Sequence, residues 1–281
     1  MTSVAVRGVP SAFAALAAVA GVLVTLAGCS SAGGSSTPAS STPPASSASA
    51  AAPSPSAAAP SSAGTATAPA PTASTTPLAA ASGQLTGTQL ESVLLPESDF
   101  PSGFATPTTG PISSGGSLTP GKATYDLATI TCATFIQHLG TTGFGETAMV
   151  SGGVGRSGQA YDQMIYQFAS APEATAFVSG VQSLAGRCGS FSATANGESG
   201  TFSLRATAGS AVGGHPTLEL LQTGTLGTSK LVLDTLFCAS GVDVFAASGV
   251  GVSGAAAPAQ PTKESIVYNL MKRQAAAAVL G

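Results

Sequence analysis

Two glycine-rich stretches of the chain have the residue types that hold phosphates in nucleotide-binding folds. Residues 152–158 read GGVGRSG and place Gly153, Gly155 and Gly158 at the spacing G-x-G-x-x-G. In a dinucleotide site this spacing opens a helix whose N-terminus faces the pyrophosphate. Here the following residues, QAYDQMIYQF, alternate like a strand. The sequence therefore predicts a hairpin turn and no nucleotide site.

The second stretch, GSLTPGKAT at 116–124, approaches the phosphate-loop pattern G-x-x-x-x-G-K. Ala123 stands where that pattern needs a Ser or Thr hydroxyl for Mg²⁺, and no buried strand precedes the stretch. We expect a plain loop here.

Acid–base and metal chemistry have few candidate residues. His138 and His215 are the only histidines, no pair of Cys, His or carboxylate residues has metal-ligand spacing, and no G-x-S-x-G occurs. The residues of a serine triad come together only in the folded protein. The sequence therefore does not exclude an enzyme, although no motif points to one. The sequence predicts a non-catalytic protein with no metal and no cofactor.

Cys29 is the residue whose surroundings predict a covalent modification. Arg7 precedes an apolar run over 12–26, and the run ends in Leu26-Ala27-Gly28-Cys29. This pattern resembles the lipobox of bacterial lipoproteins, in which a diacylglycerol is attached to the cysteine and a peptidase cuts before it. The resemblance implies a signal peptide at 1–28, lipidation of Cys29 and a location on the extracytoplasmic face of the cell membrane. The alternatives are an ordinary signal peptide with a chance cysteine, or a transmembrane anchor, which needs about 20 apolar residues.

Residues 29–85 have the composition of a tether. They are almost entirely Ser, Ala, Pro, Thr and Gly, and no charged residue occurs between Arg7 and Glu91. Without apolar periodicity there is no core to offset the entropy of ordering. We expect a disordered spacer, and its glycosylation stays open.

Residues 86–281 are long enough for one domain with a sizeable core. All 12 acidic residues and 8 of the 9 basic residues lie in this part of the chain. A mildly acidic surface argues against nucleic acid as a partner.

Three cysteines remain in this domain, and they allow one disulfide and one spare thiol in an oxidising compartment. Cys132 lies in an apolar helix-like run and Cys188 at the end of another helix, whereas Cys238 lies inside a strand-like run. We expect a Cys132–Cys188 disulfide, with Cys238 behaving as a small buried hydrophobe.

The remaining pattern predicts an α+β domain in which an antiparallel sheet is flanked by helices. Helices are expected at 89–95 with Thr86 or Thr88 as cap, at 128–139, at 172–188 and at 263–279, with an apolar stripe of Ala176, Phe177, Val181 and Leu184 on the third. Residues 103–121 read as a loop. Strand-like runs without helices between them occur at 146–152, 160–170, 191–195, 201–207, 217–223, 230–237 and 241–248.

The strand YDQMIYQF followed by the helix APEATAFVSGVQSLAGRC is similar to the extracytoplasmic sensor domain of a mycobacterial receptor kinase, and to actinobacterial lipoproteins that carry such a domain. The leading LLPESDFPSGF and the closing LMKRQAAAAVL fit those lipoproteins as well. The resemblance implies a sheet with flanking helices around an open cleft for a ligand. The sensor domain of that kinase has two disulfides, and this chain has cysteines for one.

Together these features predict a surface lipoprotein whose domain binds an unknown small-molecule or lipid ligand in a cleft, with ligand-binding residues that the sequence does not identify. An alternative function, from another class, is that of an envelope protein-interaction or assembly factor. A third candidate function is that of a lipid carrier. Met164, Tyr166 and Phe168 alternate along one strand, and Leu231, Leu233 and Phe237 along another. They are expected in the sheet core or along an apolar cleft.

Overall fold

The computed structural model describes residues 84–105, 117–118, 125–195, 198–252, 254–255 and 260–280. The signal peptide, Cys29 and nearly all of the tether lie outside these residues. The helices are α2 (Gly87–Val93), the 3-10 helix η1 (Glu97–Asp99), α3 (Cys132–His138), α4 (Ala171–Arg187) and α5 (Gln260–Leu280). The strands are β1 (Ser117–Leu118), β2 (Ala148–Arg156), β3 (Gln159–Gln167), β4 (Phe191–Ala195), β5 (Glu198–Val212), β6 (His215–Leu226), β7 (Ser229–Ser240) and β8 (Asp243–Val252).

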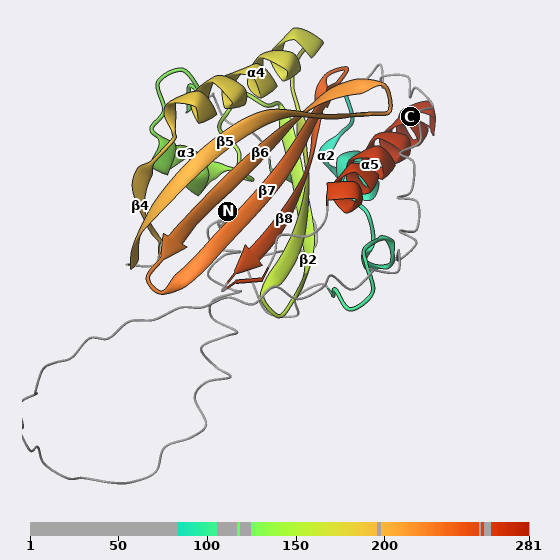
Figure 1. Ribbon diagram of the computed structural model, residues 1–281. Helices are drawn as coiled ribbons and strands as arrows, with labels where there is room; N and C mark the ends of the chain where they lie inside the picture. Colours follow the sequence, from blue (N-terminus) through green and yellow to red (C-terminus); the bar gives the residue numbers. More distant parts are fainter. Residues whose placement is uncertain are drawn as a thin grey trace, which may run out of the picture.

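The described strands form one antiparallel sheet in the order β1-β2-β3-β8-β7-β6-β5-β4 (Figure 1). This arrangement confirms the predicted α+β class. The strands β2 and β3 form one hairpin, and β4 to β8 pair in chain order, whereas β3 pairs with the distant β8. Gly158 and Gly241 turn two of the hairpins with φ of 71° and 61°, a backbone region that favours glycine.

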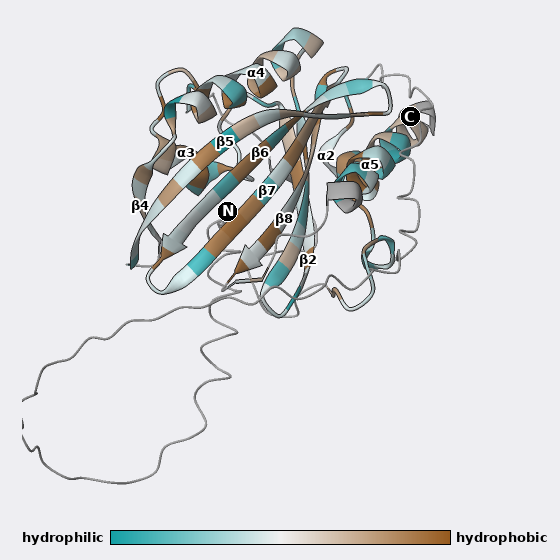
Figure 2. Ribbon diagram, viewed as in Figure 1, coloured by the Kyte–Doolittle hydropathy of each residue, from teal (hydrophilic) through white to brown (hydrophobic). Residues whose placement is uncertain are grey.

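Helices cover both faces of the sheet, and each covered face has its own apolar core. On the face that we call the α4 face, α3 and α4 pack on side chains such as Met164 and Phe237. On the opposite face, which we call the α5 face, α2 and α5 pack on side chains such as Ile165 and Leu236. Successive residues of a strand point to opposite faces, and Figure 2 shows the resulting changes of hydropathy along the strands.

Helix α4 forms largely as its local sequence predicts. The Ser170 hydroxyl accepts the Glu173 backbone N–H at 3.4 Å, and Pro172 occupies the first turn. Phe177, Val181 and Leu184 are buried as expected. Ala176 is exposed and the expectation for it is wrong, because it lies about 100° around the helix from Phe177.

The disulfide joins the first residue of α3 to the residue that follows α4. The sulfur atoms of Cys132 and Cys188 are 2.06 Å apart, and 56 residues separate them in sequence. Cys238 is a buried free thiol on the α5 face, where its Sγ lies 3.9 Å from Met271 Sδ. The pairing is the one expected from the sequence.

Three local expectations need correction. The run 103–121 contains the short strand β1 besides loop, because Ser117 and Leu118 pair with β2. Gly153 and Gly155 lie inside β2, and only Gly158 lies in the turn. The first helix begins at Gly87 because Thr86 and Gln89 form a capping box.

Among the described residues, no helix combines the length and the apolar character that crossing a bilayer requires.

Candidate functional site

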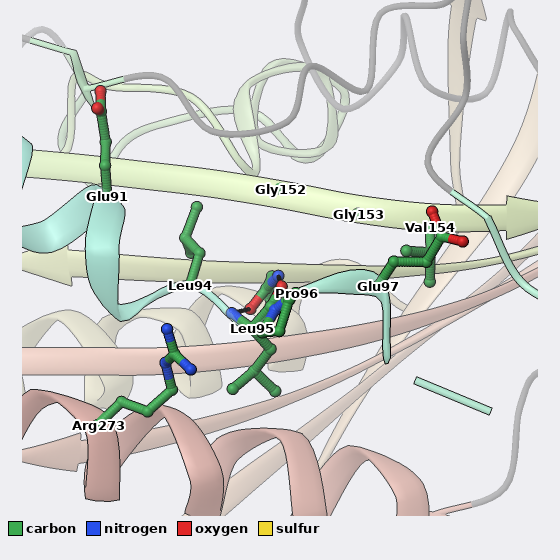
Figure 3. A pocket seen from close by; sticks show the side chains of 10 residues that line it. Glu91, Leu94, Leu95, Pro96, Glu97, Gly152, Gly153, Val154 and Arg273 are labelled. Atoms are coloured by element: carbon green, nitrogen blue, oxygen red, sulfur yellow. Dashed lines mark hydrogen bonds between the residues drawn. The ribbon is translucent and has the colours of Figure 1, made fainter. Parts of the chain in front are cut away.

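A groove on the α5 face lies between the segment that follows α2, the strand β2 and the helix α5. One hollow of this groove has a volume of about 280 Å³ and is lined by Glu91, Leu94–Glu97, Gly152–Val154, Gln163 and Arg273. Figure 3 shows Arg273 rising from α5 toward Leu94 and Leu95, with Gly152 and Gly153 on the strand behind them. A shallower hollow of about 510 Å³ continues from Arg273 to Asp99, Asn269, Lys272 and Ala276. We call the two together the α2–α5 groove.

Gln163 fixes one wall of this groove. Its buried side chain accepts the Leu95 backbone N–H at 2.8 Å and donates to the Leu95 carbonyl oxygen at 2.9 Å. The side-chain amide thus satisfies both backbone hydrogen-bonding groups of Leu95, as a neighbouring strand would. Leu95 needs such a partner because Pro96 prevents α2 from continuing. The wall is therefore held by β3 although it belongs to a loop.

Arg273 fixes the same segment from the other side. Its guanidinium donates to the Val93 carbonyl at 2.9 Å and to the Ser92 carbonyl at 2.8 Å. These carbonyls end α2 and have no partner within the helix, and a cation is favourable at that end. The link ties α5 to α2 across the groove.

The groove carries charges of both signs on exposed side chains. Glu91, Glu97 and Asp99 supply negative charge, and Lys272 and Arg273 supply positive charge. Gly152 presents no side chain, so the floor between these charges stays open. Such a surface can bind a polar ligand by charge and hydrogen bonds. Neither histidine lines it.

A stripe of polar side chains crosses the α4 face. Asp162, Ser248 and Thr235 are aligned partners on β3, β8 and β7, and the Thr235 and Ser248 hydroxyl oxygens are 2.8 Å apart. Gln222 on β6 lies in the next row, where its partners are Leu204 and Leu233. We call these four residues the polar stripe.

Gln222 is the unusual member of the polar stripe. It is 2% exposed, and neither its Oε1 nor its Nε2 has a hydrogen-bond partner among the described residues. An unsatisfied buried polar group costs about 1–3 kcal/mol, so its presence needs an explanation. Asp162 is half-buried, and loss of solvation raises the pKa of its carboxyl.

Two buried polar clusters attach α5 to the sheet. Lys263, with no exposed surface, contacts Asp234 and lies 3.2 Å from Glu219. Burial raises the pKa of Asp234, and its Oδ1 has no partner among the described residues. Asp243 accepts hydrogen bonds from Gln167 and Gln274, and burial raises its pKa to about 6.

The residues considered from the sequence are spread over the domain. His138 ends α3 with its Nε2 2.9 Å from the Tyr125 hydroxyl, and His215 begins β6 with its Nε2 3.3 Å from Ser240 Oγ. The described parts of the chain hold no group of three His, Cys, Asp or Glu side chains suited to a metal ion.

Sequence reasoning missed Arg273, Gln163 and Gln222. The groove joins residues from opposite ends of the domain, and no local pattern connects Glu91 to Arg273. For Gln222 a signal existed, because its position in TLELLQT repeats that of Leu218 and Leu220 at a period of two.

Comparison with known proteins found similarity among the solved structures. No family model matches the chain, and no curated protein matches it. The extracellular domain of PknH from Mycobacterium tuberculosis is similar, with a TM-score of 0.48, 13% sequence identity, and coverage of 68% of this chain and 96% of that chain.

Proposed function

We propose that this chain is a non-catalytic binding protein that is anchored to the outer face of a membrane through lipid at Cys29. The tether of Ser, Ala, Pro, Thr and Gly residues holds residues 86–281 away from the bilayer, and the domain captures a ligand in the α2–α5 groove. The ligand is a small polar molecule that carries both a positive and a negative group.

The observation that carries this proposal is the fixed geometry of the groove. Gln163 and Arg273 hold the segment around Leu95 from two sides, so the wall is ordered before a ligand arrives. Binding to a preorganised wall avoids part of the entropy cost of ordering it. The opposite charges of Asp99 and Lys272 favour a ligand with matching charges.

Support for the location comes from the cysteines. The lipobox-like residues before Cys29 fit export, and a Cys132–Cys188 disulfide fits an oxidising compartment. Support for a binding role comes from the composition of the groove, whose polar groups are carboxylates, amides and cations without a neighbouring nucleophile and base.

Native mass spectrometry tests the proposal. The mature chain, residues 29–281 with Cys29→Ser to keep it soluble, is secreted from an actinobacterial host and weighed before and after denaturation. We expect a mass excess of a few hundred daltons that denaturation removes. Excess mass of a second protein would support the rival envelope-interaction function instead, and the absence of any excess after incubation with a cell-envelope extract would overturn the proposal.

A filled groove provides the matched control. Gly152 has the same orientation as Val150 and Val154, which face α2 and α5, so Gly152→Val places a side chain in the groove. We expect this variant to lose the bound mass. Gly186→Val on the outer surface of α4, where an added Cβ meets nothing within 4 Å, should keep it.

A further inference from the structure

The long strand β5 has an outer edge that no described strand pairs with over its second half. β4 pairs with β5 only from Glu198 to Phe202, and β5 continues to Val212 at the border of the sheet (Figure 1). Natural sheets keep exposed edges short or place charges and prolines along them. The stretch from Ala206 to Ala211 contains neither a charged residue nor a proline. This part of β5 therefore lacks the features that prevent pairing with another chain.

The backbone groups of Ala206 and Ala208 point away from the rest of the sheet. The Leu204 N–H donates to the carbonyl oxygen of Cys188 at 2.8 Å, and Cys188 follows α4 and belongs to no strand. Backbone groups of an antiparallel strand repeat this outward direction at every second residue. No described residue hydrogen-bonds the N–H or the carbonyl of Ala206 or Ala208 on this side. The edge thus presents two donors and two acceptors to an incoming strand.

The space beside this edge is accessible. Thr207 and Ala208 are exposed, and both side chains are small. The helix α4 reaches β5 only at its end, where Cys188 lies, whereas Phe177 in its first half packs against Phe237 of β7. The helix therefore crosses the sheet at an angle and leaves the edge beyond its last residue uncovered.

Positive charge borders the start of the open edge. Arg205 is exposed on β5, and no ion pair joins it to a described residue. Arg187, also exposed, ends α4 beside the residue whose carbonyl contacts β5. Glu219 on the neighbouring strand β6 lies 3.2 Å from the ammonium of Lys263. A carboxylate opposite Arg205 on an incoming strand would form a favourable cross-strand pair, whereas a cation there would be repelled.

We propose that the open edge of β5 binds an extended acidic segment of another protein by strand addition. The backbone of the segment pairs with Ala206 and Ala208, and a carboxylate of the segment lies opposite Arg205. In this mode the main-chain hydrogen bonds supply affinity and alternate side chains supply specificity. The surface is separate from the α2–α5 groove, which lies over β2, near the other border of the sheet.

Peptide titration tests this surface on the mature chain with Cys29→Ser. The probe is the blocked, fluorescein-labelled peptide TVTVTE, and TVTVTK is its counterpart of opposite charge. The glutamate ends the probe because Cys188 occupies the edge beyond Arg205. By fluorescence anisotropy we expect one acidic peptide per chain, with the basic peptide weaker by roughly fivefold or more. Equal binding of the two peptides, or no binding of the acidic one, would overturn the proposal.

Methylated peptides test whether the backbone makes the contact. In the expected antiparallel alignment the third and fifth residues of TVTVTE direct their N–H groups to β5, and the second and fourth direct theirs away. Methylating the nitrogens of the third and fifth residues should abolish binding. Methylating those of the second and fourth should preserve it. Equal effects of the two modifications would exclude strand addition.

Variants of the protein assign the contact to β5. Ala208→Pro removes an outward N–H and no hydrogen bond within the sheet, so the domain should fold and bind the acidic peptide roughly tenfold more weakly. Arg205→Glu leaves the backbone unchanged and should reverse the preference between the two peptides. Lys230→Glu, an equal change of charge at an exposed site on β7, should preserve the preference. An unchanged preference in Arg205→Glu would overturn the proposal even if Ala208→Pro fails to fold.

Sedimentation velocity separates a peptide partner from a second copy of this chain, since exposed edges also pair with each other. We expect the parent and Ala208→Pro to be monomers without peptide. A dimer of the parent that Ala208→Pro abolishes would assign the edge to a second copy and overturn the proposal. Gly152→Val fills only the groove and should leave peptide binding unchanged, so failure of the groove and failure of the edge give different results.

Discussion

Gln163 holds Leu95 through both ends of its side-chain amide. The Leu95 N–H donates to Gln163 Oε1 at 2.8 Å, and Gln163 Nε2 donates to the Leu95 carbonyl at 2.9 Å, across 68 residues of sequence. Because Gln163 belongs to β3, inside the sheet, these two hydrogen bonds fix the position of the loop segment at Leu95. Because Leu95 lines the α2–α5 groove, this pair sets the position of the groove wall.

Replacing Gln163 should loosen that wall without unfolding the domain. In Gln163→Met the Leu95 amide loses its acceptor, so its hydrogen exchange should accelerate by roughly tenfold or more, and stability should fall by about 1–3 kcal/mol. Exchange measured by mass spectrometry of the peptide around Leu95 checks this. Gln182→Met on the exposed surface of α4 is the control, and equal exchange in the two variants would contradict the assigned role.

Lys263 should be essential for docking α5. Removing the ammonium in Lys263→Met leaves the carboxylates of Asp234 and Glu219 without their cation, which should lower the free energy of unfolding by about 3–5 kcal/mol. Urea denaturation measures the loss. Adding Asp234→Leu and Glu219→Gln should restore most of it. If the triple variant is as unstable as the single one, the loss comes from packing and not from uncompensated charge.

Stability should rise as the pH falls from 7 toward 5. Burial raises the pKa of Asp243 from 3.8 to about 6, so the folded state binds a proton in a range where the unfolded state does not. This contribution is fully present below the unfolded pKa and is lost as the pH rises through 6. It amounts to about 3 kcal/mol at most.

Asp243→Asn isolates that contribution. The variant should be more stable than the parent at pH 7, and its unfolding free energy should change less between pH 5 and pH 7. Urea titrations at both values measure the two slopes. Parallel slopes in parent and variant would show that Asp243 does not titrate in this range.

The disulfide should contribute strongly to stability. It closes a loop with a sequence separation of 56, for which the chain-entropy model gives about 4 kcal/mol. Cys132→Ser with Cys188→Ser should lower the unfolding temperature, as differential scanning calorimetry would show. Reducing agent should lower the midpoint of the parent and leave that of the double variant unchanged, whereas a parent insensitive to reduction would refute the bridge.

Cys238 should be unreactive in the folded protein. Burial raises its pKa to about 12, so almost no thiolate is present at pH 8, and the thiolate is the reactive form. In the chain with Cys29→Ser, iodoacetamide should add one label per chain in urea and none in buffer. Labelling at equal rates in both conditions would place Cys238 at the surface.

Local sequence predicted the helices because their signals lie within a few residues. The Ser170 cap, Pro172 and the spacing of Phe177, Val181 and Leu184 identify α4 without any tertiary information. The Thr86 cap and Pro96 bound α2 in the same way. The period-two strands predicted the antiparallel sheet, since hairpins need only neighbouring segments.

The sequence by itself determined the expectation of an anchor and tether, the α+β class and the approximate positions of most helices and strands. Only the tertiary structure decided that β3 pairs with β8, that Arg273 meets the end of α2, and that Gln222 lies buried without a hydrogen-bond partner among the described residues. The physical reason is range. Capping, turn formation and hydrophobic periodicity act between residues close in sequence, whereas grooves and buried polar groups depend on which distant surfaces pack together.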